Sequence, residues 1–172
     1  MSLTVPNPRA PSPFFGSAVA RGLGLVRAAA WPPLVQLMLR GALAVPFFKS
    51  GWLKWDGFLQ LSDNAVALFT DVFQLHLPGG PYPYPAPAAQ ACAAAGLEVL
   101  LPLLLVAGIG TRFAAALLLG MTGVIQLTVP DGWPIHLTWA AMALALMAHG
   151  GGPLSLDHLL ARRAAAGAAL RP

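Results

Sequence analysis

The sequence predicts an all-α fold: a polytopic membrane four-helix bundle with a short extra helix in the loop between the first two spans. Hydrophobic residues make up 57% of the 172-residue chain and charged residues only 9%, against about 25% charged in soluble domains. The apolar residues form four runs, each close to the roughly 20 residues that a helix needs to cross a bilayer core. These runs lack the alternation with period 2 that is typical of transmembrane strands.

The N-terminal tail, residues 1–33, is expected to lie outside the four spans. Residues 1–13 are rich in Pro and Ser, a composition typical of disordered segments. From Phe14 to Trp31 apolar residues mix with arginines. We therefore expect this part of the tail to form a helix that lies on the membrane surface.

Residues 34–160 hold the predicted membrane domain. Its four spans are Leu34–Leu53, Pro87–Ile109, Arg112–Val129 and Trp133–Ala148. The last three spans are joined by the short turns 110–111 and 130–132, and short turns force antiparallel neighbours, as in an up-down bundle. Residues 161–172 then form a basic tail.

The connection between the first two spans has about 30 residues, which is long enough to predict structure of its own. Ser62 is placed to cap a short helix that continues through Asp71 to Leu75. The Pro-rich segment 78–85 cannot be helical, and we expect it to return as an extended, polyproline-like strap.

The basic residues predict the orientation of the spans, because loops rich in Lys and Arg stay on the cytoplasmic side. Seven arginines lie in the tails and in the turn after the second span: Arg9, Arg21, Arg27, Arg112, Arg162, Arg163 and Arg171. The opposite side carries mainly acids, namely Asp56, Asp63, Asp71 and Asp131. Both termini are therefore predicted to face the cytoplasm.

Two charged residues lie inside predicted spans. Glu98 is in the apolar run 86–109, and Arg40 is in the first span. An acid near the bilayer centre costs a few kcal/mol on insertion scales, so it marks a functional site by default. A rise of about 1.5 Å per residue from the cytoplasmic ends puts Glu98 roughly 17 Å deep and Arg40 about 9 Å deep.

Lys49 and Gln126 lie roughly 23 Å and 21 Å deep by the same count. Glu98 thus falls between two cations, and we expect Arg40 to be its partner because Lys49 can extend outward to the interface. Two interpretations stay open. The pair either fixes the helix register, or it lines a site for a polar headgroup or a proton, with Lys49 and Gln126 nearby.

The sequence disfavours several function classes. The net charge of +4 does not come from a basic patch with interleaved aromatic residues, so nucleic acid is not an expected partner. The four histidines do not show metal-ligand spacing, and we predict no metal site. Hydrolase, NTPase and dinucleotide-binding motifs are missing, and one cysteine, Cys92, cannot form a dithiol pair. We assign no catalytic residue and expect no catalysis by this chain alone.

Three segments, in this order and spacing, resemble the DoxX family of small bacterial four-helix membrane proteins. They run from Arg40 to Gly51 and Lys54, from Glu98 to Gly108 and Arg112, and through a Gly-rich close to Ser155 and Asp157. The resemblance covers roughly residues 34–160.

This resemblance implies a four-span protein of the bacterial cytoplasmic (inner) membrane. Some members of the family belong to membrane redox systems, including a subunit of a thiosulfate:quinone oxidoreductase. We therefore expect a quinone-interacting or non-catalytic membrane subunit of a redox-linked complex, with Arg40 and Glu98 at the polar floor of a cavity. Two alternatives stay open: a transporter or permeability factor for a small molecule or metal, and a scaffold for a periplasmic partner. Assembly into a homo-oligomer is also left open.

Overall fold

The computed structural model describes residues 13–169. Seven α-helices lie in this part of the chain: α1 (Pro13–Ala29), α2 (Pro32–Trp52), α3 (Asp63–Ala67), α4 (Pro87–Ala107), α5 (Thr111–Thr128), α6 (Trp133–His149) and α7 (Leu156–Ala169). The disorder expected for residues 1–13 is a prediction about residues that lie outside the described part of the chain, except for Pro13, which begins α1. A helix forms where the surface helix from Phe14 to Trp31 is expected, and α7 crosses the predicted boundary at residue 160.

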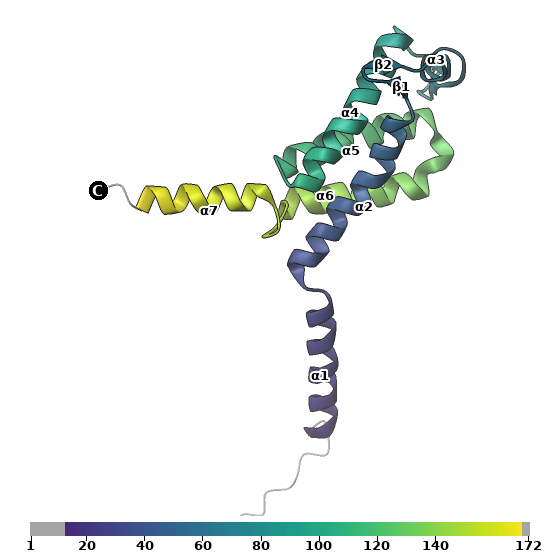
Figure 1. Ribbon diagram of the computed structural model, residues 1–172. Helices are drawn as coiled ribbons and strands as arrows, with labels where there is room; N and C mark the ends of the chain where they lie inside the picture. The colour runs from purple at the N-terminus through teal and green to yellow at the C-terminus, as the bar shows by residue number, and fades with distance from the viewer. Residues whose placement is uncertain (1–12, 170–172) are drawn as a thin grey trace, which may run out of the picture.

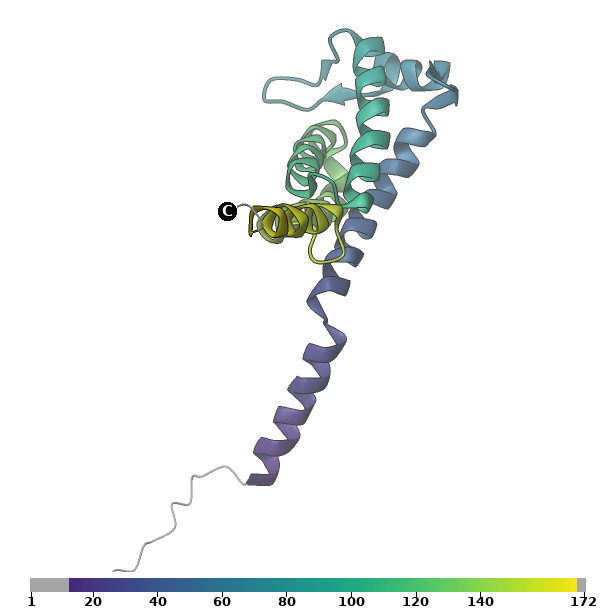
Figure 2. The ribbon, with the colours of Figure 1, turned by 60° about the vertical axis from the view of Figure 1, so that its left-hand side comes forward.

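All four predicted spans are helical, with bounds within two residues of those expected. Helix α2 packs mainly against α4, and α5 packs mainly against α6. Figures 1 and 2 show these two antiparallel pairs inclined to one another, while α1 and α7 extend away from them. Contacts of α4 with α5 and of α2 with α6 join the pairs, around a core that includes Leu43, Leu105, Leu118 and Leu146.

Two helices, α4 and α5, are each long and apolar enough to cross a membrane. A third candidate is a broken span in which the part of α1 from Val19 and the whole of α2 meet at a bend of 47°. Helix α6 has 17 residues, slightly fewer than the roughly 20 that a bilayer core requires. The fold class is thus an all-α membrane protein with two or three candidate spans.

Helices α2 and α4 approach closely because of a glycine in the last turn of α2. A Cβ added to Gly51 would lie 2.7 Å from the Cβ of Glu98 and 2.8 Å from its backbone carbonyl carbon. Any larger side chain would therefore push against the backbone of α4. Small residues at helix contacts allow such close approach within membranes.

The loop between α2 and α4 is structured, as predicted (Figure 1). Ser62 caps α3 by accepting a hydrogen bond from the N–H of Ala65 at 3.1 Å. The chain continues as a π-helix, η1 (Leu68–Val72). This helical segment ends before the predicted Leu75 because the backbone of Phe73 is extended. The Pro-rich strap is not helical: β4 (Tyr82–Pro83) pairs antiparallel with β3 (Gln74–Leu75).

A further hairpin, β1 (Trp55–Gly57) with β2 (Gln60–Leu61), was not predicted. It begins four residues after Gly51 and is tied to the following helix, because the N–H of Ser62 donates to the carbonyl of Lys54 at 2.9 Å. The loop therefore starts from a fixed point at the end of α2.

The contact at Gly51 leads to the first prediction. Gly51→Ala is expected to lower the free energy of unfolding by about 1–3 kcal/mol, the usual cost of overpacking, because its methyl group meets the backbone of Glu98. Gly41→Ala, in the same helix, has open space around the new methyl group and serves as the control. Thermal unfolding in detergent measures both, and equal melting temperatures for the two variants would contradict the packing argument.

Candidate functional site

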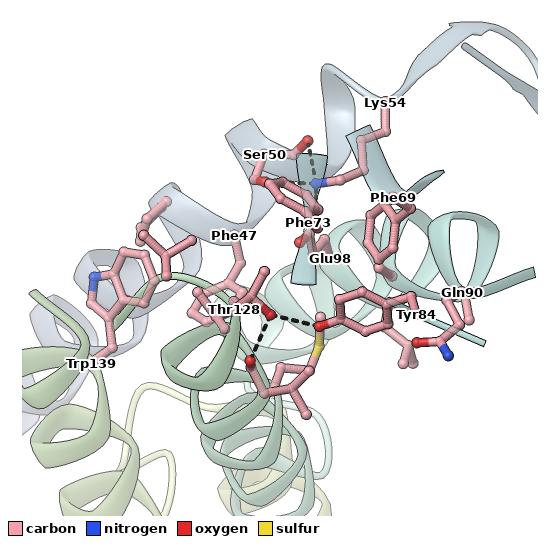
Figure 3. A pocket seen from close by; sticks show the side chains of 18 residues that line it. Phe47, Ser50, Lys54, Phe69, Phe73, Tyr84, Gln90, Glu98, Thr128 and Trp139 are labelled. Carbon is pink, nitrogen blue, oxygen red and sulfur yellow. Dashed lines mark hydrogen bonds and ion pairs between the residues drawn. The ribbon is translucent and has the colours of Figure 1, made fainter. Parts of the chain in front are cut away.

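Glu98 forms an ion pair with Lys54, and the expectation that Arg40 is its partner is wrong. The Lys54 ammonium also donates to the Ser50 hydroxyl at 2.8 Å and to the Ser50 carbonyl at 3.3 Å (Figure 3). Glu98 is 5% exposed and the Lys54 side chain 12% exposed, so the pair is largely buried. All three N–H donors of the ammonium thus have a partner.

The position of Lys54 explains why depth counted along the helices predicts the wrong partner for Glu98. Lys54 follows the last turn of α2, and its N–H donates back to the carbonyl of Gly51 at 3.1 Å. Because Gly51 touches α4 at Glu98, a long side chain starting three residues later bends back over the same carboxylate. The residue lies outside the predicted span, yet its ammonium reaches inside it.

Arg40 instead binds carbonyl groups at the opposite end of the α2–α4 pair. Its guanidinium donates to Val106 at 3.2 Å and to Leu154 at 2.7 Å. Arg40 is 1% exposed, and Gly108 is packed so closely that an added Cβ would clash with the guanidinium and with Ser155. Arg40 therefore joins α2, the end of α4 and the Gly-rich segment before α7.

Asp157 completes the cluster around Arg40, called the inner cluster below. It accepts hydrogen bonds from the N–H groups of Gly110 at 2.8 Å and Thr111 at 2.9 Å. It thereby occupies the positive N-terminal end of α5. Burial alone would raise the pKa of Asp157, but these hydrogen bonds and the nearby charge of Arg40 outweigh it and hold the pKa below its usual value.

The six residues that carry the family resemblance fall into these two clusters or at their edge. Gly51 and Lys54 surround Glu98, whereas Gly108, Ser155 and Asp157 surround Arg40. Arg112 is exposed and donates to the carbonyl of Ala148 at 3.3 Å. The structure thus separates Arg40 and Glu98, which were predicted to form one polar floor, into two groups at opposite ends of the α2–α4 pair.

Lys49 and Gln126 do not join Glu98. Lys49 is exposed, and the amide oxygen of Gln126 lies 2.8 Å from Nδ1 of His136 on α6. His136 is 7% exposed and therefore buried. The only sequence signal that favours this contact is the short turn between α5 and α6, which makes residues near its two ends neighbours.

A cavity of about 380 Å³ opens beside the Lys54–Glu98 pair, under the structured loop (Figure 3). Its walls come from α2, α4, α5, α6 and the loop, and they are mostly apolar or aromatic. The labelled lining residues in Figure 3 are Phe47, Ser50, Lys54, Phe69, Phe73, Tyr84, Gln90, Glu98, Thr128 and Trp139. An apolar cavity with a few polar groups at one end is typical of small-molecule sites.

The cavity offers both hydrogen-bond donors and acceptors. Ser50 receives a hydrogen bond from Lys54, and its own hydroxyl proton has no acceptor within residues 13–169. Only one carboxylate oxygen of Glu98 is bonded to Lys54. Thr128 donates to the carbonyl of Val124, so the Tyr84 hydroxyl, 2.6 Å from Thr128, is the donor in their contact and keeps its lone pairs available.

The described residues include no group of three or more His, Cys, Asp or Glu side chains placed to hold a metal ion. The arrangement around Glu98 instead suits an uncharged ligand with oxygen atoms, which the Ser50 hydroxyl, the Tyr84 hydroxyl and the second carboxylate oxygen of Glu98 can bind by hydrogen bonds.

Comparison with known proteins gives two matches. The model of the family described as DoxX matches residues 35–131, which contain Arg40, Lys54 and Glu98. An uncharacterised protein of Haemophilus influenzae is 31% identical over 133 residues, covering 72% of this chain and 82% of the relative. No solved structure matches the chain.

The inner cluster yields a prediction about acid stability. Because the folded-state pKa of Asp157 is lowered, its stabilisation is present above the ordinary value of 3.8 and is lost as the pH falls through the folded-state value. Asp157→Ala is expected to lower the free energy of unfolding by about 1–2 kcal/mol at pH 7, as for the loss of a helix cap. The difference from the wild type should shrink below about pH 4.

Thermal unfolding measured across the pH range checks this expectation, with the exposed Asp131→Ala as the control. A difference between Asp157→Ala and the wild type that stays constant down to the lowest pH would contradict the role given to the carboxylate.

Proposed function

The chain belongs to the DoxX family of membrane proteins, and from this membership we propose that it is a quinone-interacting membrane subunit of a redox-linked complex. The observation that supports this proposal is the cavity beside Glu98, in which an apolar volume ends at a hydroxyl, an ammonium and a carboxylate. The polar end of this cavity consists of Ser50, Lys54 and Glu98, whereas the sequence predicted Arg40 and Glu98 there.

The polar end of the cavity suits both oxidation states of a quinone. A quinone presents carbonyl acceptors, for which the free hydroxyl proton of Ser50 is the donor. A quinol presents two hydroxyl donors, for which the second oxygen of Glu98 and the Tyr84 lone pairs are acceptors. Binding both forms is the requirement for a site that exchanges quinone with quinol.

The walls of the cavity suit the rest of such a molecule. Leu97 on α4 and Val124 on α5 both line the cavity and are 38% and 48% exposed. In a membrane, surfaces of this kind face acyl chains. A molecule dissolved in the bilayer therefore reaches the polar end with its tail left among lipids.

The chain's share in redox chemistry is limited to binding and proton transfer. When a quinol binds, the carboxylate of Glu98 is the group placed to accept a hydroxyl proton, with Lys54 holding it in position. The electrons are exchanged with a partner protein, because the sequence has no flavin or haem motif and one cysteine. The proposal thus describes a subunit that has no enzyme activity by itself.

We further propose that α2, α4, α5 and α6 all cross the inner membrane and that both termini face the cytoplasm. The Arg-rich tails and Arg112 support this orientation. Reporter fusions after Arg171 and within the loop near Asp63 are expected to give opposite signals: cytoplasmic for the C-terminal fusion and periplasmic for the loop fusion. The same signal from both positions would contradict the four-span topology.

Replacing the carboxylate tests the ligand site. Glu98→Gln is expected to weaken binding of a short-chain ubiquinol about 10- to 100-fold, because a hydrogen bond to a charged group contributes about 1.5–3 kcal/mol. Titration calorimetry under anaerobic conditions, on protein that still elutes as a monodisperse species, measures the change. The exposed carboxylate variant Asp56→Asn, on the same side of the protein, serves as the control.

Equal affinity of wild type and Glu98→Gln would refute a chemical role for Glu98 and leave the Lys54–Glu98 pair with a structural role. Weaker binding in Asp56→Asn as well would show that the effect comes from general surface charge.

A further inference from the structure

A second cavity lies on the other side of the α5–α6 pair and involves none of the residues of the first. Its volume is about 330 Å³. It is lined by Leu119, Thr122, Gly123, Gln126, Trp133, His136, Leu137 and Ala140. Trp133 and Leu137 are 60% and 61% exposed, so the cavity opens on the outer surface of the helix pair. Its polar lining includes Gln126, His136 and Thr122, and the Thr122 hydroxyl donates to the carbonyl of Leu118 at 2.7 Å.

The hydrogen bonds of Gln126 determine which nitrogen of His136 carries the proton. Gln126 donates through Nε2 to the carbonyl of Pro130 at 2.9 Å, and a proline carbonyl can only accept. The amide oxygen of Gln126 therefore faces Nδ1 of His136, at 2.8 Å. Nδ1 must then be the N–H donor, and in the neutral ring Nε2 keeps a lone pair.

Nothing within residues 13–169 uses that lone pair. No hydrogen bond to Nε2 is formed by the described residues, and His136 as a whole is 7% exposed. A charged imidazolium would need a counter-ion at this site, and the cavity lining contains no acid. His136 is thus a neutral, oriented hydrogen-bond acceptor in apolar surroundings.

Two glycines shape the site around this acceptor. A Cβ added to Gly132 would clash with the imidazole ring of His136, so this residue leaves room for the ring. Gly123, in the cavity wall, has no atom within 4 Å of an added Cβ, so the space beyond it is open. The ring of His136 also lies 5.3 Å from that of Trp139, tilted by 46°.

We propose that this cavity is a second binding site, for an amphipathic molecule whose hydroxyl group donates a hydrogen bond to Nε2 of His136. An ionisable side chain inside a membrane helix marks a functional site by default, and α6 is one of the four spans proposed above. The hydroxyl is the donor that fits a neutral lone pair, and the apolar walls hold the attached ring or chain. This inference does not depend on the quinone site beside Glu98.

The hydroxyl has two chemical sources in a membrane: a phenol-type ring and the glycerol headgroup of phosphatidylglycerol. Both combine a hydroxyl donor (two in the glycerol headgroup) with an apolar body. The experiment separates them by using butylphenol as the soluble probe and by comparing nanodiscs of phosphatidylglycerol with nanodiscs of phosphatidylcholine.

Blocking the cavity without touching His136 is the sharpest test. Gly123→Leu fills the open space in the wall, whereas Gly120→Leu adds the same side chain three residues earlier, also in open space but outside the lining. Both changes replace a helical glycine with a better helix former, so both variants are expected to fold. The readout is the ¹⁵N resonance of His136 in histidine-labelled protein, with His149, an exposed histidine, as the internal reference.

In phosphatidylcholine nanodiscs, butylphenol is expected to shift the Nε2 resonance of His136 saturably in the wild type and in Gly120→Leu. Binding should be at least about 10-fold weaker in Gly123→Leu, which corresponds to about 1.4 kcal/mol. A shift in phosphatidylglycerol nanodiscs without butylphenol, lost in Gly123→Leu, would assign the site to a lipid hydroxyl. Equal behaviour of the two leucine variants, or a His136 resonance that responds to neither hydroxyl source, would overturn the proposal.

Discussion

The close contact between α2 and α4 at Gly51 is the constraint on which the Lys54–Glu98 pair and the start of the following loop depend. Without a Cβ at this position, the backbone of α4 lies against the last turn of α2, and Lys54 can cover the buried carboxylate of Glu98. A buried pair adds little net stability, yet removing one partner leaves an uncompensated charge and costs about 3–5 kcal/mol. The glycine contact thus decides whether an acid can be kept at this depth.

At the other end of the α2–α4 pair, the buried charge of Arg40 is stabilised in a different way. Arg40 is buried without an ion pair in hydrogen-bonding contact, and it is held by the carbonyls of Val106 and Leu154. These carbonyls belong to the end of α4 and to the segment before α7, where intrahelical partners are missing. Arg40 therefore stabilises chain ends, whereas Glu98 faces a cavity. Two intramembrane charges that look alike in the sequence have distinct roles.

The sequence predicts the helices well because their lengths follow from local composition. The apolar runs give the bounds of α4 within two residues, and Ser62 correctly predicts the cap of α3. The partner of Glu98 depends on a contact between distant segments. Lys54 reaches Glu98 only because the chain turns back after α2, and no periodicity encodes that turn. The hairpin β1–β2 is likewise too short for an alternating pattern to mark it.

Lys54 is shared between two parts of the molecule. Its ammonium holds Glu98 at the polar end of the cavity, while its carbonyl accepts the N–H of Ser62, the cap of the first loop helix. A molecule that replaces the Lys54 ammonium at this carboxylate therefore displaces the side chain of the residue from which the loop between α2 and α4 starts. Occupation of the cavity and the conformation of the loop between α2 and α4 are thus mechanically linked through one residue.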